Sequence, residues 1–215
     1  MSDSIFTVQA INRHRLTVDG KGVTTLVGLF GCPLKCKYCL NMDILSTKRA
    51  RRLSPEKLWE ELSIDYCYYV ASGGGITFGG GESLLHSKAI MDFIDILPEG
   101  VSVNLETSLN VPLGADMFLG VIGKVLATGG QLIIDTKALD SELYKKYTGL
   151  GNDGVQRKLS LIVENGYASQ CMIRVPIIPD FKDKNQAEIE AEYYRNMGFE
   201  DIDVFEYIIK DYMKK

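Results

Sequence analysis

Three of the five cysteines in this chain lie close together, at Cys32, Cys36 and Cys39, in the spacing C-x₃-C-x₂-C. Thiolates are soft ligands that select iron–sulfur clusters, zinc or copper(I). A [4Fe–4S] cluster normally takes four cysteine ligands. With only three, one iron keeps a coordination site that a small molecule can occupy. The spacing therefore predicts a cluster with one open iron.

A packed core and a zinc site are the alternatives to a cluster. On a helix, positions 32, 36 and 39 would share one face and could pack in a core, but Gly31 and Pro33 disfavour a continuous helix there. A structural zinc site needs four ligands. The residues available to complete such a set are His14, His86, Cys67 and Cys171. Ligand number and spacing favour the iron–sulfur cluster and leave zinc as the main alternative.

The composition is ordinary for a globular protein, with 46% hydrophobic and 24% charged residues in 215. A net charge of −4 gives no electrostatic reason to expect nucleic acid as a partner. One basic cluster, Lys48-Arg49-Ala50-Arg51-Arg52, is interpreted as a solvated segment, with docking of an acidic partner as the alternative.

Nothing in the sequence predicts export or membrane insertion. The N-terminal residues lack the basic and apolar regions of a signal peptide, and no uncharged apolar run reaches the roughly 18 residues of a membrane span. Three clustered cysteines among five do not resemble a disulfide framework. We therefore expect a cytoplasmic protein with free thiolates and no membrane partner.

Apolar segments alternate with amphipathic ones along the chain. Strands are expected over residues 24–30, 76–78, 101–106, 131–135, 170–175 and 202–207, and helices over 55–67, 84–97, 115–126, 141–147, 154–164 and 185–197. This alternation predicts a parallel sheet with helices outside. The pattern alone leaves open whether the sheet is doubly wound or forms a barrel. No linker is evident, so we expect one domain over residues 1–215.

Polar residues follow the predicted strands, at the ends where α/β folds bind ligands. They are Gly79-Gly80-Gly81-Glu82, Glu106-Thr107, Asp135-Thr136-Lys137 and Arg174. By itself a glycine-rich loop is a weak signal, and Asp135 with Lys137 could be an ordinary surface pair. An arginine inside an apolar strand needs an anion, because an unpaired buried charge is costly. Their shared position favours one site.

The cysteine motif, with the aromatic Tyr38 before its last cysteine, resembles the cluster motif of the radical S-adenosylmethionine (SAM) enzymes. Val18-Asp19-Gly20 before it and Tyr38-Cys39-Leu40-Asn41 at its end resemble the VDGPG and YCHN segments of the pyruvate formate-lyase activating enzymes. The resemblance continues at intervals to about residue 207. It implies an incomplete (β/α)₆ barrel with parallel strands inside, helices outside and one open side.

The resemblance also implies a role for each site residue. Cys32, Cys36 and Cys39 would hold the cluster, with Tyr38 and Leu40 beside the SAM. Gly80-Gly81-Glu82 resembles the GGE motif that meets the SAM amino group. Glu106-Thr107 and the D-x-K element Asp135-Thr136-Lys137 would line the SAM methionine and ribose, with room for a monovalent cation. Arg174, in Ile173-Arg174-Val175-Pro176, would face the SAM carboxylate.

Three positions depart from the family pattern. Gly79 stands where relatives often have serine, and Glu106 stands where the family tends to have aspartate. Ile208 occupies the position of a histidine that touches the SAM adenosine in the family. The last departure implies that the adenine is contacted differently.

The implied reaction is radical chemistry. An electron from a flavodoxin or ferredoxin would reduce the cluster, and SAM would be cleaved to methionine and a 5′-deoxyadenosyl radical that abstracts a hydrogen atom. The activating-enzyme resemblance implies that the hydrogen comes from a glycine of a partner glycyl radical enzyme, with Val18-Asp19-Gly20 near the mouth of the barrel.

Two alternatives remain at this point. One is a radical SAM enzyme that modifies another peptide or a small molecule. The other is a non-enzymatic iron–sulfur or zinc protein, such as an electron carrier. The polar residues at the strand ends argue against a carrier, because a carrier needs no SAM pocket.

Overall fold

Parallel strands occupy the six segments in which the sequence predicts them. The computed structural model describes residues 4–16, 18–42, 50–210 and 213. The strands are β2 (Val23–Leu29), β4 (Gly75–Gly79), β5 (Ser102–Thr107), β6 (Leu132–Asp135), β7 (Cys171–Ile177) and β8 (Asp201–Glu206). Each pairs in parallel with the next along the chain. The predicted α/β architecture is confirmed.

Two further strands lie at one edge of this sheet and were not predicted. β1 (Phe6–Leu16) runs antiparallel to β2, and β3 (Arg51–Leu53) runs antiparallel to β1. Within the described residues the order is β3-β1-β2-β4-β5-β6-β7-β8, so β3 and β8 are free edges and the sheet does not close. Arg51 and Arg52 of the basic cluster are exposed on β3, whereas Lys48 and Arg49 lie outside the described residues.

The helices follow the strands as the alternation predicts, with two corrections. They are α2 (Pro55–Leu62), α3 (Tyr66–Ser72), α4 (Ser87–Ile96), α5 (Ala115–Ala127), α6 (Ser141–Thr148), α7 (Asp153–Glu164) and α8 (Lys184–Met197). The single helix expected over 55–67 is wrong. A 3₁₀ turn at Ser63–Asp65 separates α2 from α3, because the buried Asp65 turns toward β1, where it pairs with Arg13 and His14.

The second correction concerns the segment after β4. The first turn of the helix expected over 84–97 is a 3₁₀ helix, Ser83–His86, and α4 begins only at Ser87. The Glu82 side chain caps this turn by accepting a hydrogen bond from the Leu84 backbone N–H. None of the helices in the described residues is long and apolar enough to cross a bilayer.

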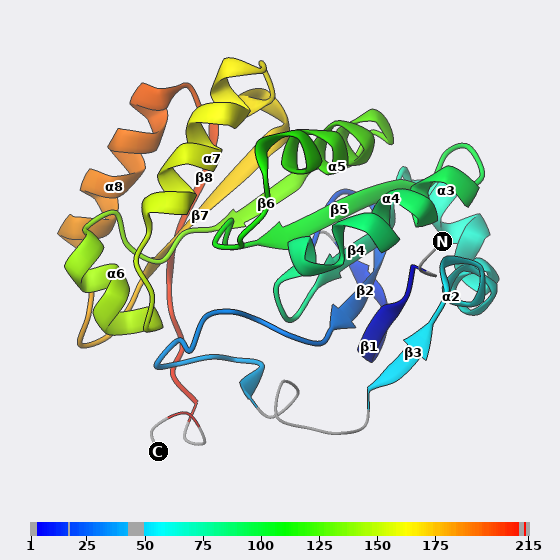
Figure 1. The fold of residues 1–215 in the computed structure, drawn as a ribbon, viewed down its shortest axis with the longest axis horizontal. Coiled ribbons are helices and arrows are strands. Elements are labelled where there is room, and N and C mark those ends of the chain that lie inside the picture. The colour runs from blue at the N-terminus through cyan, green and yellow to red at the C-terminus, as the bar shows by residue number, and fades with distance from the viewer. Residues whose placement is uncertain (1–3, 17, 43–49, 211–212, 214–215) are drawn as a thin grey trace.

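The two faces of the sheet differ in character because side chains alternate along each strand. On the outer face Phe78 and Leu105 are completely buried. They belong to a core that they share with residues of α4, α5, α7 and α8. Figure 1 shows these four helices on that side of the sheet. The inner face of the same strands carries Thr77, Asn104 and Glu106. The loop after β2 crosses on this inner side. The polar residues are thus gathered opposite the helical layer.

Candidate cluster and cofactor site

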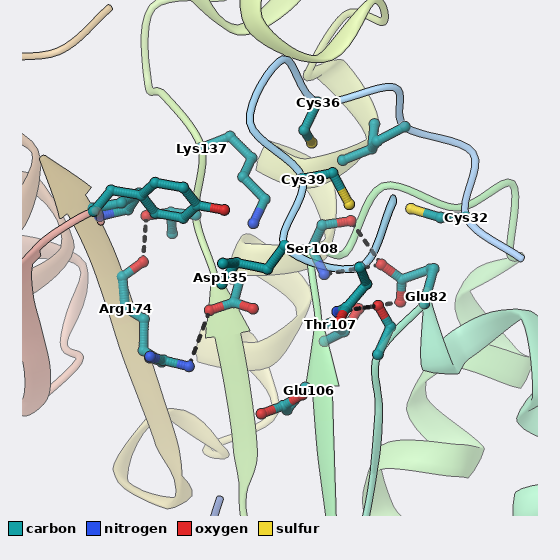
Figure 2. Close-up of a pocket in the computed structure, with 18 of the residues that line it drawn as sticks. Cys32, Cys36, Cys39, Glu82, Glu106, Thr107, Ser108, Asp135, Lys137 and Arg174 are labelled. Atoms are coloured by element: carbon teal, nitrogen blue, oxygen red, sulfur yellow. Dashed lines mark hydrogen bonds and ion pairs between the residues drawn. The ribbon is translucent and has the colours of Figure 1, made fainter. Parts of the chain in front are cut away.

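A cavity lies where the parallel strands end, between their C-terminal ends and the loop after β2 (Figure 2). It contains about 920 Å³ of empty space, part of it open to solvent. Its lining includes all but one of the predicted site residues: Cys32, Cys36, Cys39, Leu40, Gly80, Gly81, Glu82, Glu106, Thr107, Asp135, Thr136, Lys137 and Arg174. Segments far apart in the sequence therefore meet at one site, as predicted.

Tyr38 is the exception. Its ring is buried behind the cysteine loop, packed against Tyr147 and Phe181, and its hydroxyl donates a hydrogen bond to Asp180 at 3.0 Å. The Tyr207 hydroxyl, at the end of β8, donates to the backbone carbonyl of Tyr38. The structure thus places this residue where it fixes the middle of the cysteine motif from behind.

Backbone hydrogen bonds hold the rest of the cysteine loop. The backbone N–H of Lys35 donates to the Thr148 carbonyl at 2.8 Å, and that of Lys37 donates to the Tyr147 carbonyl at 2.9 Å. Both acceptors belong to the last turn of α6. On the other side, the Asn41 side-chain amide donates to the Gly80 carbonyl at 2.7 Å. The middle of the loop is therefore tied to α6, and its end is tied to the segment that follows β4.

The glycines after β4 allow this loop to come close. The Glu82 backbone N–H donates to the Gly31 carbonyl at 2.8 Å. A Cβ atom added to Gly81 would lie 2.3 Å from that same carbonyl oxygen. Gly80 has a φ of +81°, which favours glycine. The Gly-Gly pair therefore serves the approach of two backbones, in addition to any approach of a ligand.

The three cysteines fit a cluster better than a single metal ion. Figure 2 shows their side chains extending from one loop into the same cavity. Within the described part of the chain, no three His, Cys, Asp or Glu side chains are gathered closely enough to hold one metal ion. A cluster does not require the three sulfur atoms to lie this close together, because each thiolate binds a different iron. Burial raises the pKa of the Cys32 thiol to about 11, so its thiolate needs a cationic partner such as iron.

The four residues considered as additional zinc ligands lie elsewhere. His14 pairs with Asp65, and the His86 ring lies 3.0 Å from the Phe30 carbonyl oxygen. Cys67 is exposed on α3, and Cys171 is buried at the start of β7. None of these four lines the cavity. These four residues therefore do not complete a four-ligand zinc site with the cysteine motif.

The Glu82 carboxylate joins the loops after β4 and β5. It accepts hydrogen bonds from the Thr107 hydroxyl at 2.5 Å and from the Ser108 hydroxyl at 2.6 Å. It also accepts from the backbone N–H groups of Ser108 at 2.9 Å and Leu84 at 3.2 Å. Four donors occupy its two oxygens, which offer about four lone pairs. The carboxylate thus holds the site together and has little capacity left for a ligand ammonium.

Glu106 faces the cavity from the inner side of β5. Burial and the neighbouring carboxylates of Asp135 and Asp19 raise its pKa to about 8. Among the described residues, none makes a hydrogen bond or an ion pair with its carboxyl group. At neutral pH this group is therefore mostly protonated and can donate a hydrogen bond into the cavity.

Arg174 finds its anions on the two neighbouring strands. The parallel register sets it between Asp135 of β6 and Asp203 of β8, at nitrogen–oxygen distances of 3.6 and 3.8 Å. Its guanidinium lies 4.9 Å from the ring centroid of Phe205. The predicted need for an anion is met by these acids, and the side chain still lines the cavity.

Lys137 adds a second positive charge. Burial alone would lower its pKa, but the charges of Asp135 and Cys36 outweigh burial and raise the pKa above the usual value. The ammonium therefore stays charged. Figure 2 shows the Lys137 side chain between the cysteine loop and the end of β6.

Sequence reasoning missed several cavity residues. They are Leu34, Asn41, Ser108, Tyr147, Pro176, Phe205 and Tyr207. Some had a usable signal: Asn41 closes the YCxN segment, and Ser108 directly follows Glu106-Thr107. Phe205 and Tyr207 are two residues apart at the last strand and therefore point to the same side. Tyr147 had no local signal, because only the fold brings α6 to the cysteine loop.

The segment Val18-Asp19-Gly20 lies against the inner face of the sheet. The buried Asp19 pairs with Arg15, and its carbonyl accepts a hydrogen bond from the Thr77 hydroxyl at 2.5 Å. A Cβ added to Gly20 would clash with the Asn104 side chain. This segment does not line the cavity. It contacts Thr77 and Asn104, and Asn104 precedes Glu106 on β5, so the segment lies nearer the N-terminal ends of the strands.

Comparison with known proteins identifies the family. A model described as "4Fe-4S single cluster domain" matches residues 18–105. The pyruvate formate-lyase-activating enzyme of Clostridium pasteurianum is 31% identical over 170 residues, which cover 79% of this chain and 68% of that protein. This chain belongs to the glycyl radical enzyme activating enzymes of the radical SAM superfamily. The (2S)-3-sulfopropanediol dehydratase activating enzyme of Klebsiella oxytoca is 28% identical, with 83% of this chain and 72% of that protein covered.

Solved structures share the fold of this chain. Streptococcus suis SuiB bound to its precursor peptide SuiA superposes with a TM-score of 0.62 at 15% identity, over 82% of this chain and 37% of SuiB. TYW1 with a lysine-pyruvate adduct gives 0.56 at 16% identity, over 86% of this chain and 65% of TYW1. The chain spans less than two thirds of either protein. These structures share the fold, whereas the family match confirms the predicted enzyme class and the iron–sulfur cluster rather than zinc.

Proposed function

We propose that the chain binds SAM in the cavity, against a [4Fe–4S] cluster held by Cys32, Cys36 and Cys39, and removes a hydrogen atom from a glycine of a partner glycyl radical enzyme. The observation that carries the proposal is the meeting of the three cysteines with charges of both signs in one cavity. When bound, the reduced cluster and SAM supply methionine and a 5′-deoxyadenosyl radical.

The cavity charges suit the methionine part of SAM, which carries both an ammonium and a carboxylate. Lys137 and Arg174 provide the positive charges for the carboxylate. Asp135 and the backbone carbonyls after β4 provide acceptors for the ammonium, which has only donors. Because Glu82 is already filled by four donors, its task in this proposal is to fix the Gly80-Gly81 backbone.

The remaining residues orient and shield the reacting atoms. Phe205 and Tyr207 present aromatic surface on the side where Ile208 replaces the family histidine, and Ile208 itself is 75% exposed. We assign the adenine contact to these aromatic rings. The free edges β3 and β8 leave the inner face accessible from one side, which supports entry of a glycine-bearing loop and its placement at near-attack distance.

The first experiment measures SAM cleavage by anaerobically reconstituted, chemically reduced protein. We expect 5′-deoxyadenosine from the wild type, a loss of at least about tenfold in Lys137→Ala, and no loss in Lys124→Ala, a surface control that pairs with Asp95 on α4. No 5′-deoxyadenosine from the wild type would contradict the proposal.

The second experiment tests the partner. Reduced protein, SAM and a pyruvate formate-lyase are mixed, and the glycyl radical is measured by electron paramagnetic resonance. A radical signal supports a glycine as hydrogen donor. SAM cleavage without any protein radical, on this and on other glycyl radical enzymes, would contradict this part and point to another peptide or a small molecule.

A further inference from the structure

The proposed reaction consumes an electron, and the chain has no second redox centre that could supply it to the cluster. Cleavage of one SAM breaks its sulfonium C5′–S bond, consumes one electron and releases methionine as a thioether. Outside the motif the only cysteines are Cys67 and Cys171, which lie apart on α3 and β7 and cannot hold a second cluster. A one-electron donor must therefore dock near the cysteine loop. This inference rests on the proposed function.

Four lysines lie on the surface over that loop. Lys35 and Lys37 flank Cys36 and are exposed, and Lys145 and Lys146 are exposed in the last turn of α6. The backbone hydrogen bonds from residues 35 and 37 to residues 148 and 147 set the loop against this turn. We call these four residues the lysine patch.

The lysine patch keeps its charge unpaired. None of its ammonium groups forms an ion pair with a carboxylate of the described residues, whereas Lys57, Lys88 and Lys124 all do. The Lys146 ammonium instead lies over the Phe181 ring, at 5.6 Å from the centroid. Such a contact leaves the positive charge available to a partner.

Glu142 and Asp180 are acids of the described residues that lie near the patch and do not cancel its charge. Glu142 is three and four residues before the α6 lysines, and Asp180 is engaged by the Tyr38 hydroxyl. The four lysines make this surface locally basic on a protein whose net charge is −4, and these two acids offset them only in part. Such a local field attracts an acidic partner and speeds its encounter.

We infer that the lysine patch is the docking surface for a small acidic one-electron carrier protein. Charge complementarity favours such a partner, and the position of the patch favours electron transfer. Because residues 35 and 37 are the direct neighbours of Cys36, a carrier seated there is separated from the cluster by little more than the loop itself. Electron tunnelling falls steeply with distance, so this is an efficient place of entry. The carrier is oxidised by one electron as the cluster is reduced.

The test uses a purified flavodoxin as the probe and charge reversal as the perturbation. The variant Lys145→Glu/Lys146→Glu lies outside the cavity lining. Its matched control, Lys21→Glu/Arg157→Glu, changes the net charge equally at exposed residues away from the patch, on the far end of the strands and on α7. Lys145→Gln/Lys146→Gln removes the charge without adding acids to a helix C-terminus, in case the reversal impairs folding.

Binding is measured by calorimetry at low and high salt. We expect the reversal to weaken flavodoxin binding at least about tenfold at low salt, with the difference shrinking at high salt. The Gln variant should show a smaller loss, and the control should bind as the wild type does. Binding of the reversal variant that equals the wild type, or an equal loss in the control, would overturn the inference.

SAM cleavage separates this inference from the proposed function. With photoreduced 5-deazaflavin, a small reductant that needs no docking, the reversal variant should form 5′-deoxyadenosine at the wild-type rate, whereas with reduced flavodoxin it should be slowed about as much as binding is weakened. A variant that binds flavodoxin normally but fails to activate a glycyl radical enzyme would assign the patch to the substrate protein and overturn the inference. Absence of cleavage in the wild type with 5-deazaflavin would instead refute the proposed function, while the binding result would still stand.

Discussion

A Cβ atom added to Gly79 would lie 2.1 Å from Oε2 of Glu106, so the ends of β4 and β5 share one side-chain space. Both positions depart from the family pattern, in which serine and aspartate are frequent. The longer glutamate occupies the room that a serine would need. The glutamate at position 106 is therefore expected to require a glycine at position 79.

Gly79→Ser should displace the Glu106 carboxyl group and destabilise the protein by about 1–3 kcal/mol, as overpacking does. The double variant Gly79→Ser/Glu106→Asp should recover much of that loss, because the shorter side chain vacates the space. Urea unfolding of the four proteins in the cycle measures the coupling. Additive effects of the two substitutions would show that the residues do not share this space.

The pKa of Glu106 makes stability depend on pH. An unfolded glutamate releases its proton near pH 4.5, whereas the folded one holds it to about pH 8. The folded state therefore binds more protons in between, and stability falls as pH rises through this window. Asp135 and Asp19 raise this pKa, and Arg174 and Arg15 oppose them.

Glu106→Gln removes that titration. Relative to the wild type, the variant should gain more than about 1 kcal/mol of unfolding free energy between pH 5 and pH 8. Denaturant titrations across this range provide the measurement. Parallel curves for the two proteins would mean that Glu106 ionises normally.

Glu82→Gln should damage the site without touching the cysteines. The amide keeps one acceptor oxygen and turns two donors toward N–H and hydroxyl groups, so the backbone N–H of either Ser108 or Leu84 loses its partner. We expect a loss of about 1–3 kcal/mol in unfolding free energy and weaker SAM binding. Glu188→Gln, on the exposed face of α8, is the control. Unchanged stability in Glu82→Gln would show that the four hydrogen bonds do not hold the loops together.

Tyr207→Phe removes the hydrogen bond that fixes the backbone carbonyl of Tyr38. We expect a modest loss of stability, about 1 kcal/mol, and faster loss of iron to a chelator from the reconstituted protein. Tyr193→Phe removes an exposed hydroxyl that bonds Gln156 and should release iron at the wild-type rate. Equal rates in all three proteins would deny Tyr207 a role in holding the cysteine loop.

The features that could be predicted are those with a local sequence pattern. The six parallel strands are apolar and β-branched, and their polar ends follow them directly in the sequence, so both the sheet and its site could be predicted. β1 was not predicted because its second half, including Asn12 and His14, is exposed and polar. β3 was not predicted because Arg51 and Arg52 make it resemble a solvated segment.

What could not be predicted depends on distant partners. The sequence shows a tyrosine in the cysteine motif, but only the fold sets Asp180 and Tyr207 behind it. It shows Glu82 in a ligand-binding motif, but not the four donors that fill its carboxylate. It shows an arginine that needs an anion, but the sheet register chooses Asp135 and Asp203.

The central claim is that three cysteines hold a cluster whose open iron binds SAM. Electron paramagnetic resonance on anaerobically reconstituted, reduced protein, with and without SAM, tests it most directly. We predict a [4Fe–4S]⁺ signal that changes when SAM is added, disappears in Cys36→Ala and persists in Cys67→Ala, which removes an exposed thiol on α3. A signal indifferent to SAM, or a colourless protein loaded with zinc, would contradict the claim.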